Sequence, residues 1–423
     1  MKRIFKSAVA AVVLLSVLLL SLAGCAMEIS AECLSEGVTP RAVEYTSELS
    51  SLAPELSDFA LRLFGGAVRG EENSVISPAS VLIALAMAAN GAEGNTLAEM
   101  ESVLGADIDA LNLYLKAYTE HLTSSDKAEL SVANSLWLKE RQDFIPNGDF
   151  LQKNADYYGA DIYKAPFNWQ TLRDVNNWVK KATDGMIPRV LDKIPEDAIA
   201  YLVNAIAFEA KWLSVYEKHD VREATFYNAD GSRSRVDFMH STEGRYVSNG
   251  NCKGFLKSYE GARYSFAALL PEEGVSPEEL IESLRGEELY AMLSSPEYTT
   301  VQTKMPKFKT EYSAELSEIL SAMGMKDAFD PDTADFSRFG RIERGGGMEG
   351  GIFISRVLHK AYIEVGEMGT KAGAVTIVEM LDGTSGGPVE KPKEVCLDRP
   401  FVYMIIDNES KIPLFIGITN SLG

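Results

Sequence analysis

Cysteine and histidine are scarce in this chain, and their spacing excludes the sites that would need them. Only four cysteines and four histidines occur among 423 residues. The cysteines (Cys25, Cys33, Cys252 and Cys396) show no Cys-x-x-Cys spacing, and the histidines form no close pair. A disulfide scaffold would need more cysteines, and a zinc site would need cysteines or histidines at regular short spacing. We therefore expect neither, and no other cofactor.

Basic residues are fewer than acidic residues in this chain. The chain has 41 lysines and arginines against 61 aspartates and glutamates, which gives a formal net charge of −20. Nucleic-acid binding needs a cluster or stripe of cations, and none is visible in the sequence. A nucleic-acid partner is therefore not expected.

One long hydrophobic run occurs, at the N-terminus. Lys2, Arg3 and Lys6 precede an uncharged run over residues 8–20, which is short for a permanent membrane span. The run ends in Leu-Ala-Gly-Cys25, which resembles the bacterial lipobox, where the cysteine is diacylated and the signal is cut before it. Cleavage would remove these three cations and change the net charge from −20 to −23. An ordinary secretory signal with a coincidental cysteine is the alternative.

The sequence predicts three segments. Residues 1–24 are a lipoprotein signal peptide, and residues 25–48, which are polar and aperiodic, are a flexible tether. No Gly/Pro/Ser-rich linker or repeat divides the remainder, so residues 49–423 are expected to form one domain. The expected location is the cell envelope, lipid-anchored through Cys25 outside the inner membrane, at the outer membrane or cell surface, or secreted.

Helical patterns dominate the first half of the domain and strand patterns the second. Apolar periodicity and end signals predict helices over residues 52–64, 78–89, 95–104, 174–182 and 314–323. Alternating or β-rich runs predict strands over 200–208, 265–270, 299–305, 361–365, 401–406 and 414–418. This distribution indicates an α+β fold with large sheets.

Residues 366–395 form an unusually long connection, which is typical of a functional loop. Its first half, residues 369–381, divides by period two into an uncharged face that begins with small residues and a second face that carries both charges. Such a segment could form a strand, although the simpler alternative is a normal strand followed by a long turn. The second half is rich in glycine and proline, as in an exposed tip.

The motif from Glu367 to Thr376, Glu-Met-Gly-Thr-Lys-Ala-Gly-Ala-Val-Thr, resembles the hinge of serpins, inhibitors whose reactive loop inserts into their main sheet. Further serpin-like motifs follow in family order over roughly residues 50–423. They are Asn73–Ser80, Ala92–Thr96, Val175–Val179 with Thr183 and Gly185, Leu202–Phe208 with Trp212, Met305–Phe308, Gly324–Met325, Ala334–Ser337, Ile354–Lys360, Pro400–Tyr403 and Pro413–Gly417.

This resemblance implies a serpin fold with three β-sheets, about eight or nine helices and an exposed reactive loop. It implies a monomer that is not an enzyme but a suicide-type inhibitor of a serine protease, or alternatively of a cysteine protease. The hinge residues would be Glu367, Gly369, Thr370, Ala372, Gly373, Ala374 and Thr376. A structural gate beneath the main sheet would comprise Ser77, Ser80, Asn204 and His359.

The composition of the hinge favours inhibition, because the inward set (Thr370, Ala372, Ala374 and Thr376) contains no charge, proline or bulky side chain. Family spacing from Glu367 places the scissile bond at Gly383–Thr384. Met380 and Leu381 are alternatives, because glycine offers no side chain to a protease pocket. Residues 97–130, where some serpins bind polyanions, hold seven acidic residues and two lysines, which disfavours a heparin-like partner.

Three other interpretations compete. A non-inhibitory surface binding protein on a serpin scaffold is the main alternative. Residues 383–387 fit the Gly-x-Ser-x-Gly motif of hydrolases, but prolines and no helical pattern follow them. Residues 345–350 fit Gly-x-Gly-x-x-Gly, yet no βαβ unit surrounds them, and the sequence suggests no role for this stretch.

Overall fold

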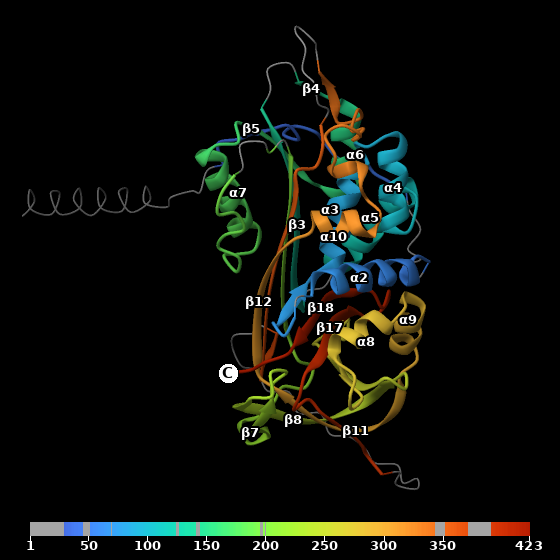
Figure 1. Ribbon diagram of the computed structural model, residues 1–423, viewed down its shortest axis with the longest axis vertical. Coiled ribbons are helices and arrows are strands. Elements are labelled where there is room, and N and C mark those ends of the chain that lie inside the picture. Colours follow the sequence, from blue (N-terminus) through green and yellow to red (C-terminus); the bar gives the residue numbers. More distant parts are fainter. Residues whose placement is uncertain are drawn as a thin grey trace, which may run out of the picture.

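A computed structural model describes residues 29–44, 51–68, 70–123, 127–140, 144–194, 198, 200–342, 352–370 and 391–423. In these residues, two large sheets and one small sheet combine with nine α-helices (Figure 1). The helices are α2 (Ala53–Ala67), α3 (Pro78–Ala89), α4 (Gly94–Leu104), α5 (Ile108–Thr123), α6 (Gly148–Tyr158), α7 (Trp169–Ala182), α8 (Pro277–Ser283), α9 (Gly286–Ser294) and α10 (Ser317–Met323). The predicted α+β fold with three sheets and eight or nine helices is confirmed.

The seven-stranded sheet has the order β1-β5-β3-β6-β15-β14-β12. Its strands are β1 (Glu32–Cys33), β3 (Ala128–Lys139), β5 (Asp161–Ala165), β6 (Ala200–Lys211), β12 (Phe308–Glu315), β14 (Arg356–Gly366) and β15 (Gly369–Thr370). β6 and β14 run parallel to each other, whereas β15 is antiparallel to both. A strand of only two residues therefore lies between two long ones.

The nine-stranded sheet brings the C-terminal strands together with the middle of the chain. Its order is β16-β11-β8-β9-β10-β17-β18-β2, and β7 pairs with β8 outside this path. These strands are β2 (Ser74–Ile76), β7 (Val221–Tyr227), β8 (Arg233–Ser248), β9 (Cys252–Ser258), β10 (Tyr264–Pro271), β11 (Glu297–Pro306), β16 (Lys393–Cys396), β17 (Phe401–Asp407) and β18 (Pro413–Thr419). The third sheet pairs β4 (Phe144–Pro146) with β13 (Gly340–Ile342).

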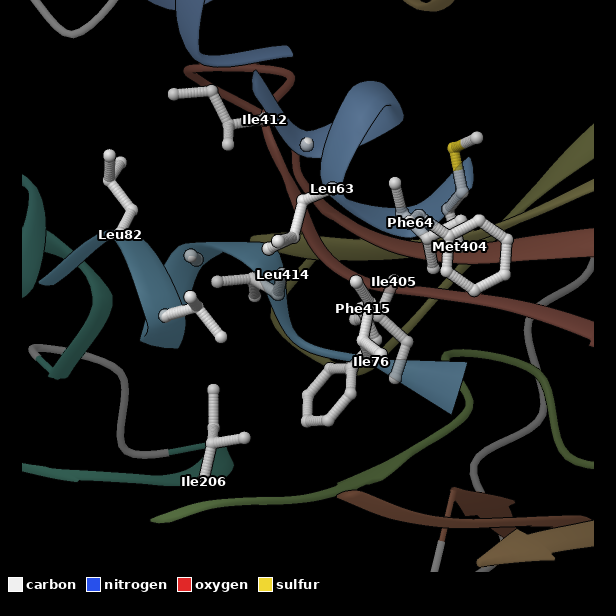
Figure 2. Close-up of a cluster of buried hydrophobic side chains, with 14 of the residues drawn as sticks. Leu63, Phe64, Ile76, Leu82, Ile206, Met404, Ile405, Ile412, Leu414 and Phe415 are labelled. Carbon is white, nitrogen blue, oxygen red and sulfur yellow. The ribbon is translucent and has the colours of Figure 1, made fainter. Parts of the chain in front are cut away.

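α3 is the central helix of the main core. Every one of its twelve residues is buried, as expected for a helix that is apolar on all sides. Pro78 begins the helix, where its missing N–H leaves no hydrogen bond unmade. Side chains from α2, α3, β2, β6, β17 and β18 meet in this core (Figure 2). The N-terminus of α3 is thereby fixed beneath the seven-stranded sheet.

α7 covers the opposite face of the seven-stranded sheet from α3, as Figure 1 shows. Val175, Trp178 and Val179 form a second core with side chains of β3, β5, β6 and β14. The helix begins five residues before the predicted start at 174, because Asn168 and Thr171 form a capping box. Sequence periodicity did not show this polar start.

Residues 29–44 contact the domain, although the sequence predicts a flexible tether over 25–48. β1 pairs with β5 at the edge of the seven-stranded sheet. The backbone N–H of Ser30, its hydroxyl and the N–H of Ala31 donate to one carboxylate oxygen of Asp174 on α7, at 3.0, 2.7 and 3.0 Å. Asp174 is buried, so these donors supply hydrogen bonds that it could not obtain from water.

A second buried carboxylate holds the later part of this segment. Arg41 approaches Asp156 of α6 with an N–O distance of 2.7 Å. Although burial opposes it, hydrogen bonding to Arg41 keeps the pKa of Asp156 below its ordinary value. Residues 29–44 are thus attached by hydrogen bonds, an ion pair and one short strand pairing, and Ile29, Ala31 and Cys33 pack against the second core. The apolar contribution is confined to this short alternation, which is too brief to have predicted the attachment from the sequence.

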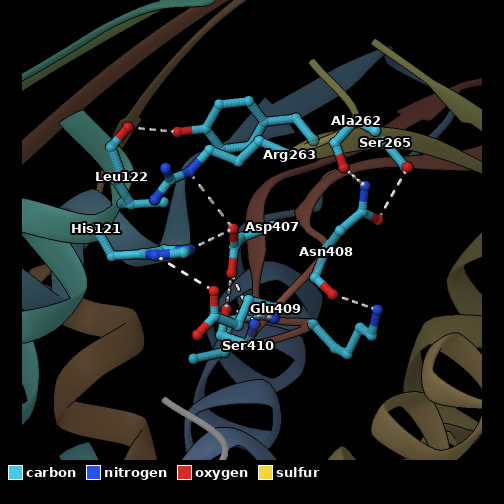
Figure 3. A network of polar contacts seen from close by, with 12 residues as sticks. His121, Leu122, Ala262, Arg263, Ser265, Asp407, Asn408, Glu409 and Ser410 are labelled. Carbon is cyan, nitrogen blue, oxygen red and sulfur yellow. Dashed lines mark hydrogen bonds and ion pairs between the residues drawn. The ribbon is translucent and has the colours of Figure 1, made fainter. Parts of the chain in front are cut away.

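A buried carboxylate also joins α5 to the turn between β17 and β18 (Figure 3). Asp407 is fully buried and accepts hydrogen bonds from the N–H and hydroxyl of Ser410, at 2.7 and 2.8 Å. His121 Nε2 lies 3.1 Å from Asp407, and its Nδ1 lies 3.4 Å from Glu409. Burial opposes ionisation of Asp407, but the bonds from His121 and Ser410 hold its pKa below the ordinary value.

We expect Asp407→Ala to destabilise the native fold by about 3 kcal/mol, because it leaves buried donors unpaired. A lower thermal denaturation midpoint would show this. Glu409→Ala is the matched control, since this carboxylate is 60% exposed and contacts the same histidine. The control should change stability by less than about 0.5 kcal/mol. Equal effects of the two variants would contradict the structural role of Asp407.

Candidate functional site

β6 and β14 pair directly at one end and are separated at the other. Residues 201–205 of β6 lie opposite residues 356–360 of β14. At the far end β15 lies between them, with Gly369 opposite Lys211 and Thr370 opposite Ala210. On its other side, Thr370 lies opposite Val365. Across the described strands, no direct pair joins residues 206–209 to 361–364, so the sheet divides there.

The two residues of β15 fit closely into this division. Gly369 has φ +149°, and a Cβ at this position would lie 2.1 Å from the carbonyl oxygen of Ala210. Only glycine avoids that contact. Thr370 is 1% exposed, and its hydroxyl lies 2.6 Å from the hydroxyl of Tyr259, the residue after β9. The chain therefore enters the sheet at Gly369.

Trp212 fixes the turn that leads from β14 into β15. Its indole N–H donates to the carbonyl of Gly366 at 2.8 Å, and its backbone N–H donates to the carbonyl of Met368 at 3.0 Å. Its ring stacks on Tyr259, with 4.5 Å between centroids. Tyr216 N–H also donates to the carbonyl of Glu367 at 3.0 Å. Three carbonyls of the turn are thus held by residues that follow β6.

The side chain of Glu367 is held by an ion pair. Lys307 Nζ lies 2.9 Å from Glu367 and 3.2 Å from Asp237. The hydrogen bond to Glu367 raises the pKa of Lys307. In turn, the pKa of Glu367 is lowered, because the bond from Lys307 outweighs the opposing effect of burial. Both groups are charged at neutral pH, so the pair attaches the start of the loop to the segment between β11 and β12.

A buried ion pair lies behind Trp212 and Tyr216. Lys257 Nζ is 2.8 Å from Glu243, with only 2% and 14% of the two side chains exposed. The same ammonium lies 4.5 Å from the ring centroid of Tyr216 and 5.5 Å from that of Trp212. Such contacts attract a cation to an aromatic face. The aromatic residues that hold the turn are therefore packed against a fixed charge.

The predicted gate residues lie at the end where β6 and β14 pair directly. Ser77 precedes α3, and its backbone N–H donates to His359 Nε2 at 3.0 Å. This N–H lies at the positive end of the α3 dipole, which favours a neutral imidazole as acceptor. His359 is buried, and desolvation lowers its pKa to about 4. Asn204 lies opposite His359 in the strand register, and Ser80 is buried one turn into α3.

The structure thus brings Ser77 and His359 into contact and places Glu367, Gly369 and Thr370 at the division of the sheet. The remaining loop predictions (Ala372, Gly373, Ala374, Thr376, Met380, Leu381, Gly383 and Thr384) and the lipidation prediction at Cys25 lie outside the described residues. Sequence reasoning missed Tyr259, Lys257, Glu243, Lys307 and Asp237. Lys307 belongs to the Met305–Phe308 motif, but no motif predicts its contacts or those of the other four, because the partners are far apart in the sequence.

Three cysteines of the described chain, Cys33, Cys252 and Cys396, are free thiols. Burial raises the pKa of both Cys252 and Cys396 to about 11. Within the described ranges, no cluster of three or more histidine, cysteine or acidic side chains could hold a metal ion. The same ranges contain no helix with the length and hydropathy needed to cross a bilayer.

Known proteins resemble the chain over most of its length. The family model "Serpin (serine protease inhibitor)" matches residues 54–421. Leukocyte elastase inhibitor A of Rattus norvegicus is 30% identical over 392 residues, covering 87% of this chain and 99% of that protein. A serpin-like protein of Thermococcus kodakarensis is 30% identical over 372 residues, covering 86% of this chain and 84% of its own length.

Solved structures show the same similarity. The thermophilic serpin tengpin in its native state is 44% identical, with a TM-score of 0.86 over 93% of this chain and 100% of that chain. Tengpin in its latent state is 43% identical, with a TM-score of 0.76 over 91% of this chain and 100% of that chain. The fold described here is therefore more similar to the native state than to the latent one. By family model, curated relatives and structure, this chain belongs to the serpin family.

Proposed function

We propose that this chain is a single-use inhibitor of serine proteases, which traps its target by inserting part of its own loop into the seven-stranded sheet. Members of the family are in general protease inhibitors rather than enzymes. The observation that carries the proposal is the position of Gly369 and Thr370 between β6 and β14. These residues occupy the start of a strand position that the following loop could continue.

The chemical step belongs to the protease. Its serine oxygen attacks the carbonyl carbon of the scissile peptide bond, and the carbon–nitrogen bond breaks. The serine proton passes to the nitrogen, which becomes the new amino terminus of the C-terminal part of the inhibitor. An ester then joins the protease to the loop. Release of strain at the cut allows the residues after Thr370 to enter the sheet and carry the protease with them. The uncleaved state is kinetically trapped, because insertion would add hydrogen bonds that it lacks.

Insertion requires five direct residue pairs between β6 and β14 to part. The gate residues stand at this position, since His359 lies opposite Asn204 and accepts from the N-terminus of α3. A buried imidazole must keep a partner in either state of the sheet. We infer that the gate residues set the barrier to strand separation and take no part in proton transfer.

We place the scissile bond at Gly383–Thr384, from the family spacing that begins at Glu367. Cleavage after Met380 or Leu381 is the alternative; these side chains would suit chymotrypsin-like or elastase-like proteases, but they leave less chain to insert. We also propose that Cys25 is diacylated and holds the protein in the cell envelope outside the inner membrane, at the outer membrane or cell surface. A lipid-anchored inhibitor would protect the cell envelope from proteases that reach it.

The decisive experiment mixes the mature chain with elastase-, chymotrypsin-, trypsin- and subtilisin-like proteases. We expect a covalent complex that survives denaturing gel electrophoresis with at least one of them. The mass of the C-terminal fragment released under denaturing conditions then identifies the scissile bond. Cleavage without any such complex would overturn the inhibitory proposal and favour a non-inhibitory binding protein on the same scaffold.

Thr370→Arg should convert the inhibitor into a substrate. Thr370 is buried against Tyr259, so an arginine would bring an unpaired charge into the sheet. We expect the number of inhibitor molecules consumed per trapped protease to rise by about tenfold or more, because insertion becomes slower than hydrolysis of the ester.

Thr370→Val is the matched control. It keeps the shape of the threonine and adds no charge, but it removes the hydroxyl that meets Tyr259. Inhibition by this variant should stay close to that of the parent chain. Unchanged stoichiometry in Thr370→Arg would show that insertion of the following loop does not depend on an uncharged side chain at this position of the sheet.

The buried His359 makes the native state sensitive to acid. Its pKa is lowered to about 4 from an ordinary value of 6.5. Between these pH values the unfolded chain binds a proton that the native chain does not. Native stability therefore falls as the pH drops from 6.5 towards 4, and the loss levels off below that. The two pKa values correspond to a loss of about 3 kcal/mol.

Thermal denaturation midpoints between pH 7 and pH 4 measure this effect. His359→Gln should flatten the pH dependence in that window, because the titrating group is gone. His219→Gln is the control, since this histidine is 74% exposed. If both variants kept the slope of the parent chain, another group would be responsible for the acid sensitivity.

A further inference from the structure

The outer face of α7 differs in charge from the rest of the molecule. We define this face by its exposed residues Trp169, Arg173, Lys180 and Lys181. At about 100° per residue these four positions fall within an arc of about 120°. The face thus carries three cations and no carboxylate, on a chain whose net charge is −20.

Carboxylates of the described chain do not neutralise the cations on this face. Among the residues that the structure describes, none of the three forms an ion pair, whereas Arg41, Arg235 and Arg338 each do. Arg173 lies over the ring of Trp169, at 5.6 Å from its centroid. Trp169 is itself 68% exposed, which is unusual for so large an apolar side chain.

The attachment of residues 29–31 beneath α7 limits how far Cys25 can lie from this helix. Ser30 and Ala31 donate to Asp174, the residue that follows Arg173 on α7. Ile29 packs against the core beneath the helix. Only three residues separate Ile29 from Cys25, so the two Cα atoms lie at most about 14 Å apart. An acyl chain on Cys25 would therefore enter a bilayer close to α7.

We propose that the outer face of α7 lies on the surface of an anionic bilayer, with Trp169 at the headgroup level and the three cations among the lipid phosphates. This inference rests on the lipid anchor proposed above. Tryptophan prefers the membrane interface, and each cation near an anionic surface strengthens adsorption. The anchor and this face together orient the inhibitor on the membrane, which a lipid on a flexible tether could not do.

Tryptophan fluorescence tests the contact directly, because the other three tryptophans (Trp137, Trp178 and Trp212) are buried. The acylated protein is reconstituted into vesicles of phosphatidylglycerol with brominated acyl chains, which quench a tryptophan that reaches the interface. We expect quenching in the parent chain and its loss in Trp169→Phe. Absence of quenching in acylated, vesicle-bound protein would overturn the proposal.

A charge-matched pair of variants tests the cations. One variant carries Arg173→Gln, Lys180→Gln and Lys181→Gln; the control carries Lys218→Gln, Arg222→Gln and Arg233→Gln, on exposed residues at and beside β7. With non-acylated Cys25→Ala chains, sedimentation with phosphatidylglycerol vesicles at low salt should fall about tenfold or more in the α7 variant and little in the control. Equal sedimentation of the two would contradict the proposal.

The lipid-anchor proposal and the bilayer-contact proposal can be refuted independently. The intact mass of the parent protein from the cell envelope shows whether Cys25 carries acyl chains. A chain without them would refute the lipoprotein proposal, while the sedimentation experiment would still decide the role of α7. If the chain is acylated but the α7 substitutions change neither quenching nor sedimentation, the lipid anchor is retained and the bilayer contact is refuted.

Discussion

The structure depends on how β6 and β14 satisfy their backbone hydrogen bonds. They pair with each other near the gate residues and with β15 at the far end, so the sheet is complete only where one of these partners is present. Unpaired backbone groups in a sheet attract any strand that fits. Trp212, Tyr259 and the Lys307–Glu367 pair hold the chain at the mouth of this division. The position between β6 and β14 is thus occupied only at its start, where Gly369 and Thr370 are held in place.

Much of the fold could be predicted from periodicity. The prediction over residues 78–89 coincides with α3, because proline begins the helix and its apolar residues continue to the end. The strands predicted over 401–406 and 414–418 are confirmed as β17 and β18. In contrast, the start of α7 rests on a polar capping box, and residues 314–315 extend β12 rather than α10. Polar end contacts and strand register leave little trace in a hydrophobic pattern.

The candidate site was predictable only in part. The hinge and gate residues belong to short motifs, so the resemblance located them by sequence alone. The contacts that hold them could not be found this way, because each joins segments far apart in the sequence: Tyr259 meets Thr370 across 111 positions and Lys307 meets Glu367 across 60. Likewise, residues 29–44 looked like a tether because buried Asp174 and Asp156 supply much of their attachment and only Ile29, Ala31 and Cys33 add a short apolar alternation. Long-range polar contacts require the structure.

The place of the C-terminal strands has a consequence for a chain cut in its loop. β17 lies in the interior of the nine-stranded sheet, between β10 and β18, and every residue of both C-terminal strands is buried. β16 is paired with β11 at the edge of the same sheet. A cut between residues 371 and 390 would therefore divide the polypeptide without dividing the particle. The two fragments would remain associated as a noncovalent heterodimer, and the shorter one would be an integral part of the fold and not a leaving product.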